Sequence, residues 1–341
     1  MALLLAVLSL PLTMAACAGP GAPAAGIMLE ERRLAMGSEL HLTAWTDDGP
    51  RTRAAFAAVF AEFERLEALL SVWRAGSEVS RLNAAPVGTP VPVHADTRAV
   101  LQYARQVSEW TSGRFDITFG ALAEVWKFDH DMDRRVPTAA EIAARLRRVD
   151  YRAIDLDQTG GTAAIVRPGV TVHLGGIGKG YAVGKAVAIL RTAGLTNFMV
   201  QAGGDLYVAG VAGDTPWRLG IQDPRGPGGT PFAMVELADA TFSTSGDYER
   251  YFEVDGVRYH HILDPATGQP ARGTRSVTIV ARDPAVADGL STGVFILGPE
   301  RGMALVEDLR DVEAVIVTAA NQVLISTGLR DRVLIQRAPT G

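Results

Sequence analysis

The sequence predicts a mixed α+β fold, with mostly antiparallel sheets and helices inserted at irregular intervals. Beyond residue 170, short runs of β-branched and aromatic residues follow one another between Gly-rich turns. The helical patterns are few and do not alternate regularly with the strands, which argues against a doubly wound parallel sheet. The chain has 341 residues, 48% of them hydrophobic and 21% charged, with 36 Gly and 18 Pro, as in globular proteins. No Pro/Gly/Ser linker divides residues 28–338, so we expect one two-lobed unit there.

The first residues resemble an export signal and are not expected to belong to the fold. An apolar run at 2–12 is too short to span a membrane stably and is followed by Met14-Ala-Ala-Cys17. This pattern resembles a bacterial lipobox, in which the cysteine is lipidated. We therefore expect a lipoprotein signal peptide at 1–17, a flexible tether at 18–27 and a lipid anchor on the periplasmic side of the envelope. An ordinary secretory signal cleaved after Ala18 is the alternative. Both types of signal usually have a basic residue before the apolar run, and this sequence has none there.

Composition also limits the functional class. Cys17 is the single cysteine, which excludes an internal disulfide framework and a multi-cysteine metal site. The net charge of −5 and the lack of a basic patch interleaved with aromatic residues do not favour nucleic-acid binding.

The N-terminal half carries most of the helical patterns. Residues 36–44 alternate as a strand, and 52–70 place six apolar residues on one helical face (Phe56, Val59, Phe60, Phe63, Leu66 and Leu70). A second helix is predicted at 96–111. Thr138-Ala-Ala-Glu141 has the form of a capping box that opens a third helix.

The C-terminal half is predicted to be mainly β. A helix is expected to begin near Tyr181, and two more lie near 284–297 and 299–309. Strands are expected at 170–174, 197–202, 206–211, 217–222, 233–237, 241–244, 250–254, 257–262, 275–281, 313–318 and 322–326.

Gly175-Gly-Ile-Gly-Lys-Gly180 stands between a predicted strand and a predicted helix. Glycines there allow a phosphate to approach the backbone, and the helix N-terminus offers free N–H groups and a favourable dipole. The spacing fits neither a Walker A loop nor a dinucleotide fingerprint. A tight turn without a ligand is the alternative.

Asp288 and Thr292 are four residues apart, which places their side-chain oxygens on one face of a helix. A carboxylate and a hydroxyl, completed by water and substrate phosphates, form a usual environment for Mg²⁺. A solvated Asp288 at a capped helix start is the alternative.

Residues 261–268, with the sequence His-Ile-Leu-Asp-Pro-Ala-Thr-Gly, bring an imidazole to the mouth of a rigid turn. Such a histidine suits proton transfer near neutral pH. Because side chains alternate along a strand, the neighbouring His260 would face the other way.

These blocks, taken in order, resemble the ApbE-type FAD:protein FMN transferases over nearly the whole mature chain. The matching blocks are Met36-Gly-Ser, Leu70-Ser-Val-Trp, Ser77-Glu-Val-Ser-Arg-Leu-Asn, Phe115-Asp-Ile-Thr, Leu174-Gly-Gly-Ile-Gly-Lys-Gly-Tyr-Ala, Ala202-Gly-Gly-Asp, Thr244-Ser-Gly-Asp-Tyr-Glu-Arg, the segment 261–268 and Ala287-Asp-Gly-Leu-Ser-Thr. The resemblance implies a T-fold-related catalytic unit. It also implies a Mg²⁺-dependent enzyme that transfers FMN from FAD to a Thr or Ser of an acceptor protein and releases AMP.

The resemblance also implies roles for individual residues. His261 would be the catalytic base, and Mg²⁺ would be bound by Asp288, Thr292 and the carbonyl of Gly176. The residues implied in cofactor binding are Met36, Trp73, Phe119, Gly120, Ala121, Leu122, His173, Lys179 and Ile262. Trp73 would stack on the flavin, although a packed core tryptophan is the alternative. The family usually has Asp where this chain has His173, which puts the polar contact made there in doubt.

Two other functions fit the same residues: a Mg²⁺-dependent FAD pyrophosphatase that releases FMN and AMP, and a periplasmic flavin-binding lipoprotein without catalysis. A purely binding protein needs no base, so His261 beside Asp288 and Thr292 argues against the last. The expected acceptor is a membrane-associated, flavin-carrying electron-transfer protein.

Overall fold

The structure, a computed structural model, describes residues 26–129 and 131–341. The predicted signal peptide, its Cys17 and the tether up to residue 25 lie outside these residues. The last predicted tether residue, Ile27, already begins the first strand.

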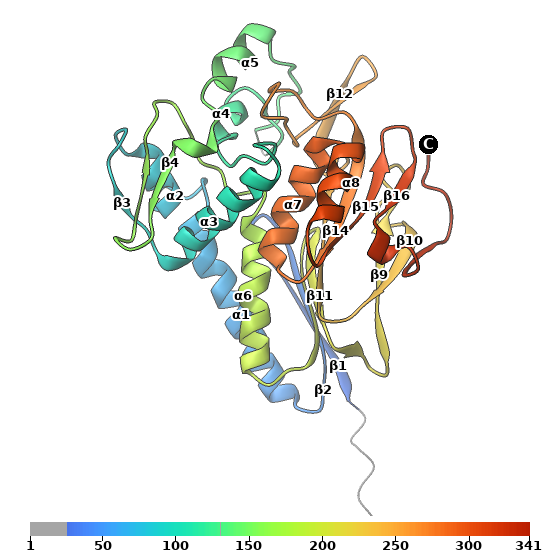
Figure 1. The fold of residues 1–341 in the computed structure, drawn as a ribbon. Coiled ribbons are helices and arrows are strands. Elements are labelled where there is room, and N and C mark those ends of the chain that lie inside the picture. Colours follow the sequence, from blue (N-terminus) through green and yellow to red (C-terminus); the bar gives the residue numbers. More distant parts are fainter. Residues whose placement is uncertain (1–25, 130) are drawn as a thin grey trace, which may run out of the picture.

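A large antiparallel sheet forms the centre of the molecule (Figure 1). Every pairing between its neighbouring strands is antiparallel. In spatial order its eight strands are β1 (Ile27–Ala35), β2 (Ser38–Thr46), β6 (Asn197–Ala202), β7 (Asp205–Ala209), β11 (Ala240–Gly246), β14 (Thr274–Ala281), β15 (Val312–Thr318) and β16 (Val323–Ile325).

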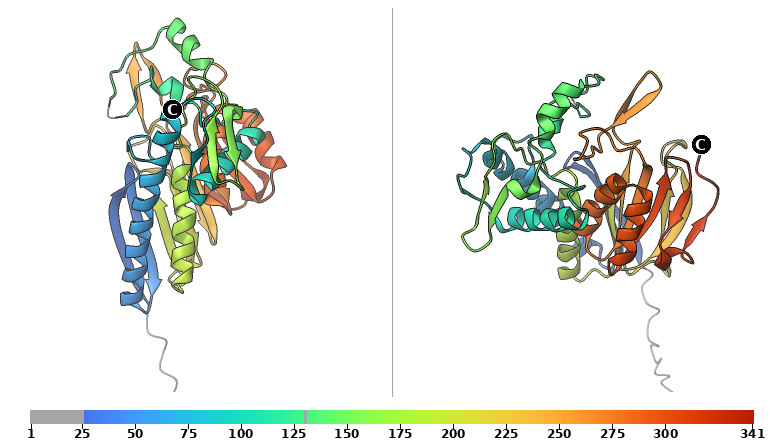
Figure 2. Two further views of the ribbon diagram at one scale, coloured as in Figure 1. Left: turned by 90° about the vertical axis from the view of Figure 1, so that its left-hand side faces the viewer. Right: turned by 45° about the horizontal axis from the view of Figure 1, so that its top comes forward.

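Helices cover one face of this sheet (Figures 1 and 2). They are α1 (Gly49–Leu70), α6 (Gly178–Thr192), α7 (Pro284–Leu297) and α8 (Pro299–Asp308), and α3 (Ala95–Trp110) packs on α7 and α1. The apolar stripe predicted on the first helix is buried in the largest core cluster, with Phe56, Phe63 and Leu66 at 0% exposure. Burying such an aromatic or leucine side chain stabilises the fold by roughly 1.5–3 kcal/mol.

A second, four-stranded sheet covers part of the other face. Its strands are β8 (Val211–Ala212), β9 (Thr215–Gln222), β10 (Pro231–Leu237) and β17 (Val333–Ile335). Val208, Phe232 and Val317 lie in the separate core cluster between the two sheets. Every residue of β7 is therefore buried, since this strand has protein on both sides.

Smaller elements surround these layers. A three-stranded sheet contains β3 (Val91–Pro92), β4 (Ile154–Asp157) and β5 (Thr162–Ile165). The short helices are α2 (Glu78–Ala84), α4 (Gly120–Ala123) and α5 (Ala139–Leu146), with 3-10 turns at Tyr151–Ala153 and Thr327–Leu329. The hairpin of β12 (Tyr251–Val254) and β13 (Val257–His260) projects at the top of Figure 1.

An aromatic cluster holds this hairpin against the segment between α4 and α5. Phe252 of β12 stacks on Phe128 at 5.4 Å between ring centroids, and Tyr259 of β13 stacks on Trp126 at 5.7 Å. Pairs of this kind contribute about 0.5–1.5 kcal/mol beyond their buried area. The cluster therefore positions the strand that leads into His261.

The predicted α+β class with antiparallel sheets is confirmed, as is the capping box, in which Thr138 and Glu141 satisfy each other's backbone N–H groups. The predicted strand at 170–174 is wrong. Only a single parallel bridge joins Thr171 to Phe119. The Asn83 side chain instead binds both polar groups of Val172, accepting from its N–H at 2.8 Å and donating to its C=O at 2.9 Å.

The strand predicted at 257–262 ends at His260, so His261 and Ile262 lie in the following loop. The helix expected to begin near Tyr181 begins at Gly178, three residues earlier. Strand β1 was not predicted, because its side chains are mostly exposed and include Glu30-Glu-Arg-Arg33. An edge strand of this kind carries no strong hydrophobic alternation.

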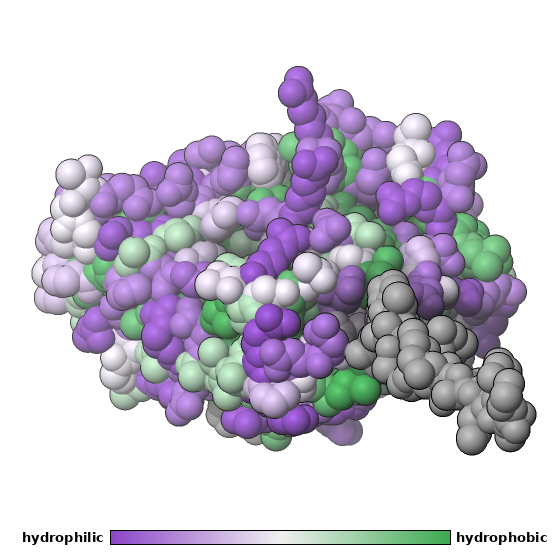
Figure 3. Space-filling view, turned by 90° about the horizontal axis from the view of Figure 1, so that it is seen from below, coloured by the Kyte–Doolittle hydropathy of each residue, from purple (hydrophilic) through white to green (hydrophobic). Residues whose placement is uncertain are grey.

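The surface seen from below mixes hydrophilic residues with small, separate apolar groups (Figure 3). In the described part of the chain, no helix has both the length and the apolar character needed to cross a membrane.

Candidate active site

The N-termini of α6 and α7 meet at the centre of the site. Gly180 donates its N–H to Oδ2 of Asp288 at 2.8 Å. A Cβ atom at Gly180 would lie 2.2 Å from the carbonyl oxygen of Pro284 and 2.5 Å from Cβ of Asp288. Only glycine permits this approach, so the Gly-rich loop serves here to bring a carboxylate to the helix N-terminus.

Thr292 follows Asp288 by one turn of α7, as its spacing predicts. Its Oγ1 lies 3.7 Å from the position of a Cβ on Gly176, in the loop before α6. The carboxylate, the hydroxyl and the backbone of Gly176 therefore converge from two segments more than 100 residues apart in the sequence.

Half-buried Lys179 forms an ion pair with buried Asp205, with Nζ 3.0 Å from Oδ2. Burial, and then the charge of Asp205, raise the pKa of Asp288 to about 7, against the opposing effects of Lys179 and the Gly180 N–H. Burial lowers the pKa of Lys179, but the charges of Asp205 and Asp288 outweigh this effect and raise that pKa above its ordinary value. Because two carboxylates share one lysine, the site favours an additional cation.

The donor set suits Mg²⁺. In the described ranges, no three His, Cys, Asp or Glu side chains are grouped so as to bind a metal alone. Mg²⁺ prefers hard oxygen ligands and keeps several waters, so one or two carboxylates with hydroxyl, carbonyl and phosphate oxygens are sufficient. Asp288, Thr292 and the carbonyl of Gly176 supply such oxygens.

His261 lies directly after β13 and is half-buried. Its Nδ1 is 3.3 Å from the carbonyl oxygen of Arg250, which also accepts the His261 N–H at 3.1 Å. A carbonyl can only accept, so Nδ1 carries the hydrogen and Nε2 keeps its lone pair. Burial, and then the charge of Arg250, lower the pKa of His261 well below its ordinary value. The imidazole is therefore neutral and able to accept a proton at pH 7.

His260 has both ring nitrogens occupied. Its Nε2 donates to the carbonyl of Ala271 at 2.8 Å, and its Nδ1 accepts the N–H of Ile262 at 3.3 Å. The side chain is 2% exposed and packs edge-on against Phe295. His260 thus holds the loop in place, and of the two histidines only His261 has a ring nitrogen free to act as a base.

Arg250 connects the hairpin to the segment that follows α4. Its guanidinium forms a close ion pair with Asp129. Burial lowers the pKa of both His261 and His173, and the charge of Arg250 lowers both further, with Asp129 opposing it at His173. The charges of Arg250 and Asp129 therefore act on the same surroundings as His261 and His173.

Trp73, Phe119 and His173 form a group of rings beside the Gly-rich loop. The His173 ring lies 5.1 Å from that of Phe119 and 6.5 Å from that of Trp73, measured between centroids. Trp73 is 60% exposed, so it is available to stack on a planar ligand and is not a core residue. His173 Nδ1 accepts the N–H of Gly175 at 3.1 Å, which leaves Nε2 as a hydrogen donor in the neutral ring.

The other residues predicted to bind the cofactor differ in accessibility. Met36 occupies the β1–β2 turn with φ 48°, and its Cε lies 3.7 Å from the position of a Cβ on Gly178. Gly120, Ala121, Leu122 and Ile262 are buried, and the side chains of Leu122 and Ile262 lie in core clusters. These four residues therefore belong to the packed interior.

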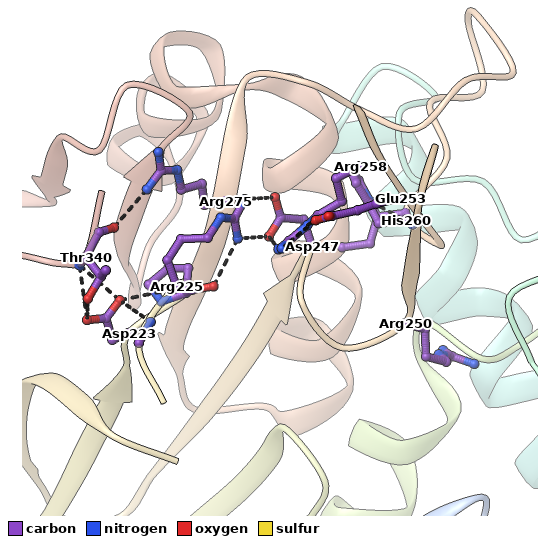
Figure 4. A network of polar contacts seen from close by, with 12 residues as sticks. Asp223, Arg225, Asp247, Arg250, Glu253, Arg258, His260, Arg275 and Thr340 are labelled. Atoms are coloured by element: carbon purple, nitrogen blue, oxygen red, sulfur yellow. Dashed lines mark hydrogen bonds and ion pairs between the residues drawn. The ribbon is translucent and has the colours of Figure 1, made fainter. Parts of the chain in front are cut away.

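A network of ion pairs supports the loop after β11 (Figure 4). Asp247 accepts two hydrogen bonds from Arg225, each 2.6 Å, and lies 3.6 Å from Nη1 of Arg258 in the hairpin. Bidentate arginine pairs have a well-defined geometry. Asp247 therefore joins the end of β11 to the hairpin that leads to His261.

Three site residues were not predicted: Asp205, Ser245 and Ser291. Asp205 ends the block Ala202-Gly-Gly-Asp, and Ser245 lies in Thr244-Ser-Gly-Asp. Both blocks were recognised, but nothing local to them indicates which partner each side chain meets. Those partners, Lys179 for Asp205 and Ser291 with Thr292 for Ser245, lie far away in the sequence.

Curated proteins similar to this chain share one description. A protein of Treponema pallidum named FAD:protein FMN transferase is 35% identical over 297 residues, covering 83% of this chain and 82% of the relative. A protein of Vibrio cholerae with the same name is 36% identical, covering 72% and 73%.

Solved structures agree. The ApbE protein of Thermotoga maritima matches with a TM-score of 0.82 at 35% identity, covering 90% of this chain and 99% of that one. The flavin transferase ApbE of Vibrio cholerae matches with a TM-score of 0.81 at 28% identity, with the same coverage. The family model described as ApbE family matches residues 36–316, a span that contains every residue of the site described above. This chain belongs to the ApbE family.

Proposed function

We propose that this protein transfers FMN from FAD to a threonine or serine hydroxyl of an acceptor protein, with Mg²⁺ bound by Asp288, Thr292 and Gly176. The observation that carries the proposal is a neutral His261 with a free Nε2, in one electrostatic environment with Lys179 and the Asp288 carboxylate. A flavin carrier without catalysis would need no such base.

In the proposed reaction, the acceptor hydroxyl attacks the phosphorus atom of the FMN half of FAD. The bond from that phosphorus to the bridging oxygen breaks, and its electron pair leaves with AMP. Nε2 of His261 accepts the hydroxyl proton, which contributes typically 10²–10⁴-fold to the rate. When bound, Mg²⁺ supplies charge neutralisation at the diphosphate.

The remaining residues bind and orient. Lys179 is positively charged and lies beside the Gly-rich loop, where it can bind a phosphate oxygen. Trp73 and Phe119 offer ring faces to an isoalloxazine, and His173 offers an N–H donor at the same place.

The test is a transfer assay with FAD, Mg²⁺ and candidate acceptor domains, followed by mass spectrometry of the intact acceptor. A mass increase equal to one phosphoester-linked FMN, abolished by EDTA and restored by Mg²⁺, is expected. Free FMN and AMP without any adduct would favour the pyrophosphatase function. Tight FAD binding without either product would favour a carrier.

A periplasmic location with a lipid anchor at Cys17 is part of the proposal and rests on the sequence pattern. The acceptor is proposed to be a membrane-associated electron-transfer protein in the same compartment.

A further inference from the structure

A chain of three hydroxyl groups connects β11 with α7: those of Ser245, Ser291 and the proposed metal ligand Thr292. Ser291 Oγ donates to the backbone carbonyl of Asp288 at 2.8 Å. Ser245 Oγ lies 2.8 Å from Ser291 Oγ and 3.1 Å from Thr292 Oγ1. The contacts form a continuous chain from Thr292 to the Asp288 carbonyl.

Counting protons gives this chain a single direction. A serine or threonine hydroxyl has one proton to donate, and a carbonyl oxygen has none. Because Ser291 gives its proton to Asp288, it must accept from Ser245. Ser245 has then used its own proton and must accept from Thr292. Thr292 is therefore the donor at the far end, and the lone pairs of its Oγ1 are free.

We propose that Ser245 and Ser291 are positioning residues that orient the Thr292 hydroxyl so that it offers lone pairs, and not its proton, to the cation. This inference rests on the proposed function, which makes Thr292 a Mg²⁺ ligand. A hydroxyl whose proton pointed at the cation would repel it, so the orientation decides whether Thr292 can bind. The row of hydrogen bonds ends on the backbone carbonyl of Asp288, the same residue that supplies the carboxylate ligand.

The test is Mn²⁺ binding to the purified protein without FAD, measured by electron paramagnetic resonance of the free ion. Ser245→Ala removes the acceptor of the Thr292 proton and is expected to weaken Mn²⁺ binding by about 10–100-fold, the usual effect of losing such a supporting group. Ser291→Ala is expected to weaken binding as well, although no hydrogen bond joins Ser291 to Thr292. Without Ser291, the Ser245 proton can turn toward Thr292.

Ser243→Ala is the matched control. Ser243 lies on the same strand two residues before Ser245, is fully buried, and its hydroxyl has no hydrogen-bond partner in the described part of the chain. This variant should bind Mn²⁺ as the wild type does. Thermal unfolding in EDTA identifies any variant that has simply lost its fold, and Ser291→Ala then tests the chain if Ser245→Ala does not fold.

Wild-type Mn²⁺ affinity in both Ser245→Ala and Ser291→Ala would overturn the inference, provided that Thr292→Val and Asp288→Asn bind more weakly. If Thr292→Val and Asp288→Asn also keep wild-type affinity, the metal site itself is misplaced and the proposed function fails. Equal weakening in Ser243→Ala would show a general packing effect of β11 and would also overturn the inference.

Discussion

At the residue scale, two adjacent histidines differ because of what their ring nitrogens contact. The rings of His260 and His261 come from neighbouring positions, but only His260 has both nitrogens bound within the protein. His261 uses one nitrogen on the Arg250 carbonyl and keeps the other. The two histidines differ because His260 is the buried last residue of β13, whereas His261 begins the following loop.

His261→Ala is expected to lower the rate of FMN transfer by roughly 10²–10⁴-fold with little change in FAD affinity. Since the pKa of His261 is held well below its ordinary value, protonation of His261 should not lower the wild-type rate as the pH drops through 6.5 in saturating Mg²⁺, where the bound cation keeps Asp288 ionised, and the acidic limb due to His261 should lie lower. Single-turnover rates from pH 5 to 8 and flavin fluorescence titrations measure the two quantities. Equal loss of FAD binding would make His261 a structural residue.

His260 is expected to make stability dependent on pH. Burial lowers its pKa to about 4, whereas the unfolded chain has the ordinary value near 6.5. The unfolded state therefore takes up the proton first, and the stabilisation present above pH 6.5 is lost as the pH falls toward 4. Between pH 7.5 and 5.0 this group should lower the free energy of unfolding by about 2 kcal/mol.

Urea unfolding at the two pH values measures this change. The control is His260→Gln, which retains a side-chain donor but does not titrate, so its pH dependence should be smaller by that amount. An identical pH dependence in both proteins would contradict the assignment.

At the element scale, the crossing of α6 and α7 at Gly180 determines the geometry of the site. Gly180→Ala would place a methyl group 2.2 Å from a backbone oxygen, so the helices must separate. We expect a loss of about 1–3 kcal/mol in the free energy of unfolding, and weaker Mn²⁺ binding because Asp288 moves away from the Gly180 N–H.

Gly184→Ala is the control for this prediction. It lies one turn further along α6, where a Cβ would be 3.8 Å from Cδ of Pro284, an ordinary contact. Since alanine favours helix over glycine, this variant should be unchanged or stabilised by about 0.5–1 kcal/mol. Denaturant unfolding compares the two, and equal losses would show that the helix crossing is not specific to Gly180.

At the scale of the whole molecule, the first described strand and the hairpin that precedes His261 lie at opposite ends (Figures 1 and 2). Ten positions separate Cys17 from Ile27, a reach of roughly 35 Å when fully extended. A lipid at Cys17 would therefore attach the chain at the end of the molecule opposite this hairpin.

Cys17→Ser is expected to move the protein from the membrane fraction to the soluble periplasmic extract, because the thioether-linked lipid can no longer form. Immunoblots of fractionated cells measure the distribution. An unchanged distribution would rule out Cys17 as the anchor.

The sequence by itself determined the elements with strong periodicity and the residues carried by ordered motifs. The apolar stripe of α1, the Thr138 capping box and the pairing of Asp288 with Thr292 on one helical face are local patterns, so a single segment is enough to predict them. The turn at Asp264–Gly268 is also local, since the N–H groups of Thr267 and Gly268 both donate to the carbonyl of Asp264.

Only the tertiary structure decided which of these segments meet. Residues 170–174 form a loop that hydrogen bonds from Asn83 hold, and not the predicted strand. Asp205 forms an ion pair with Lys179, and the hydroxyl of Ser245 contacts that of Thr292. Each of these contacts joins residues far apart in the sequence that the packing of separate elements brings together. The local sequence carries no information about which distant residue each of these side chains contacts, whereas close packing of the folded chain permits only one such partner.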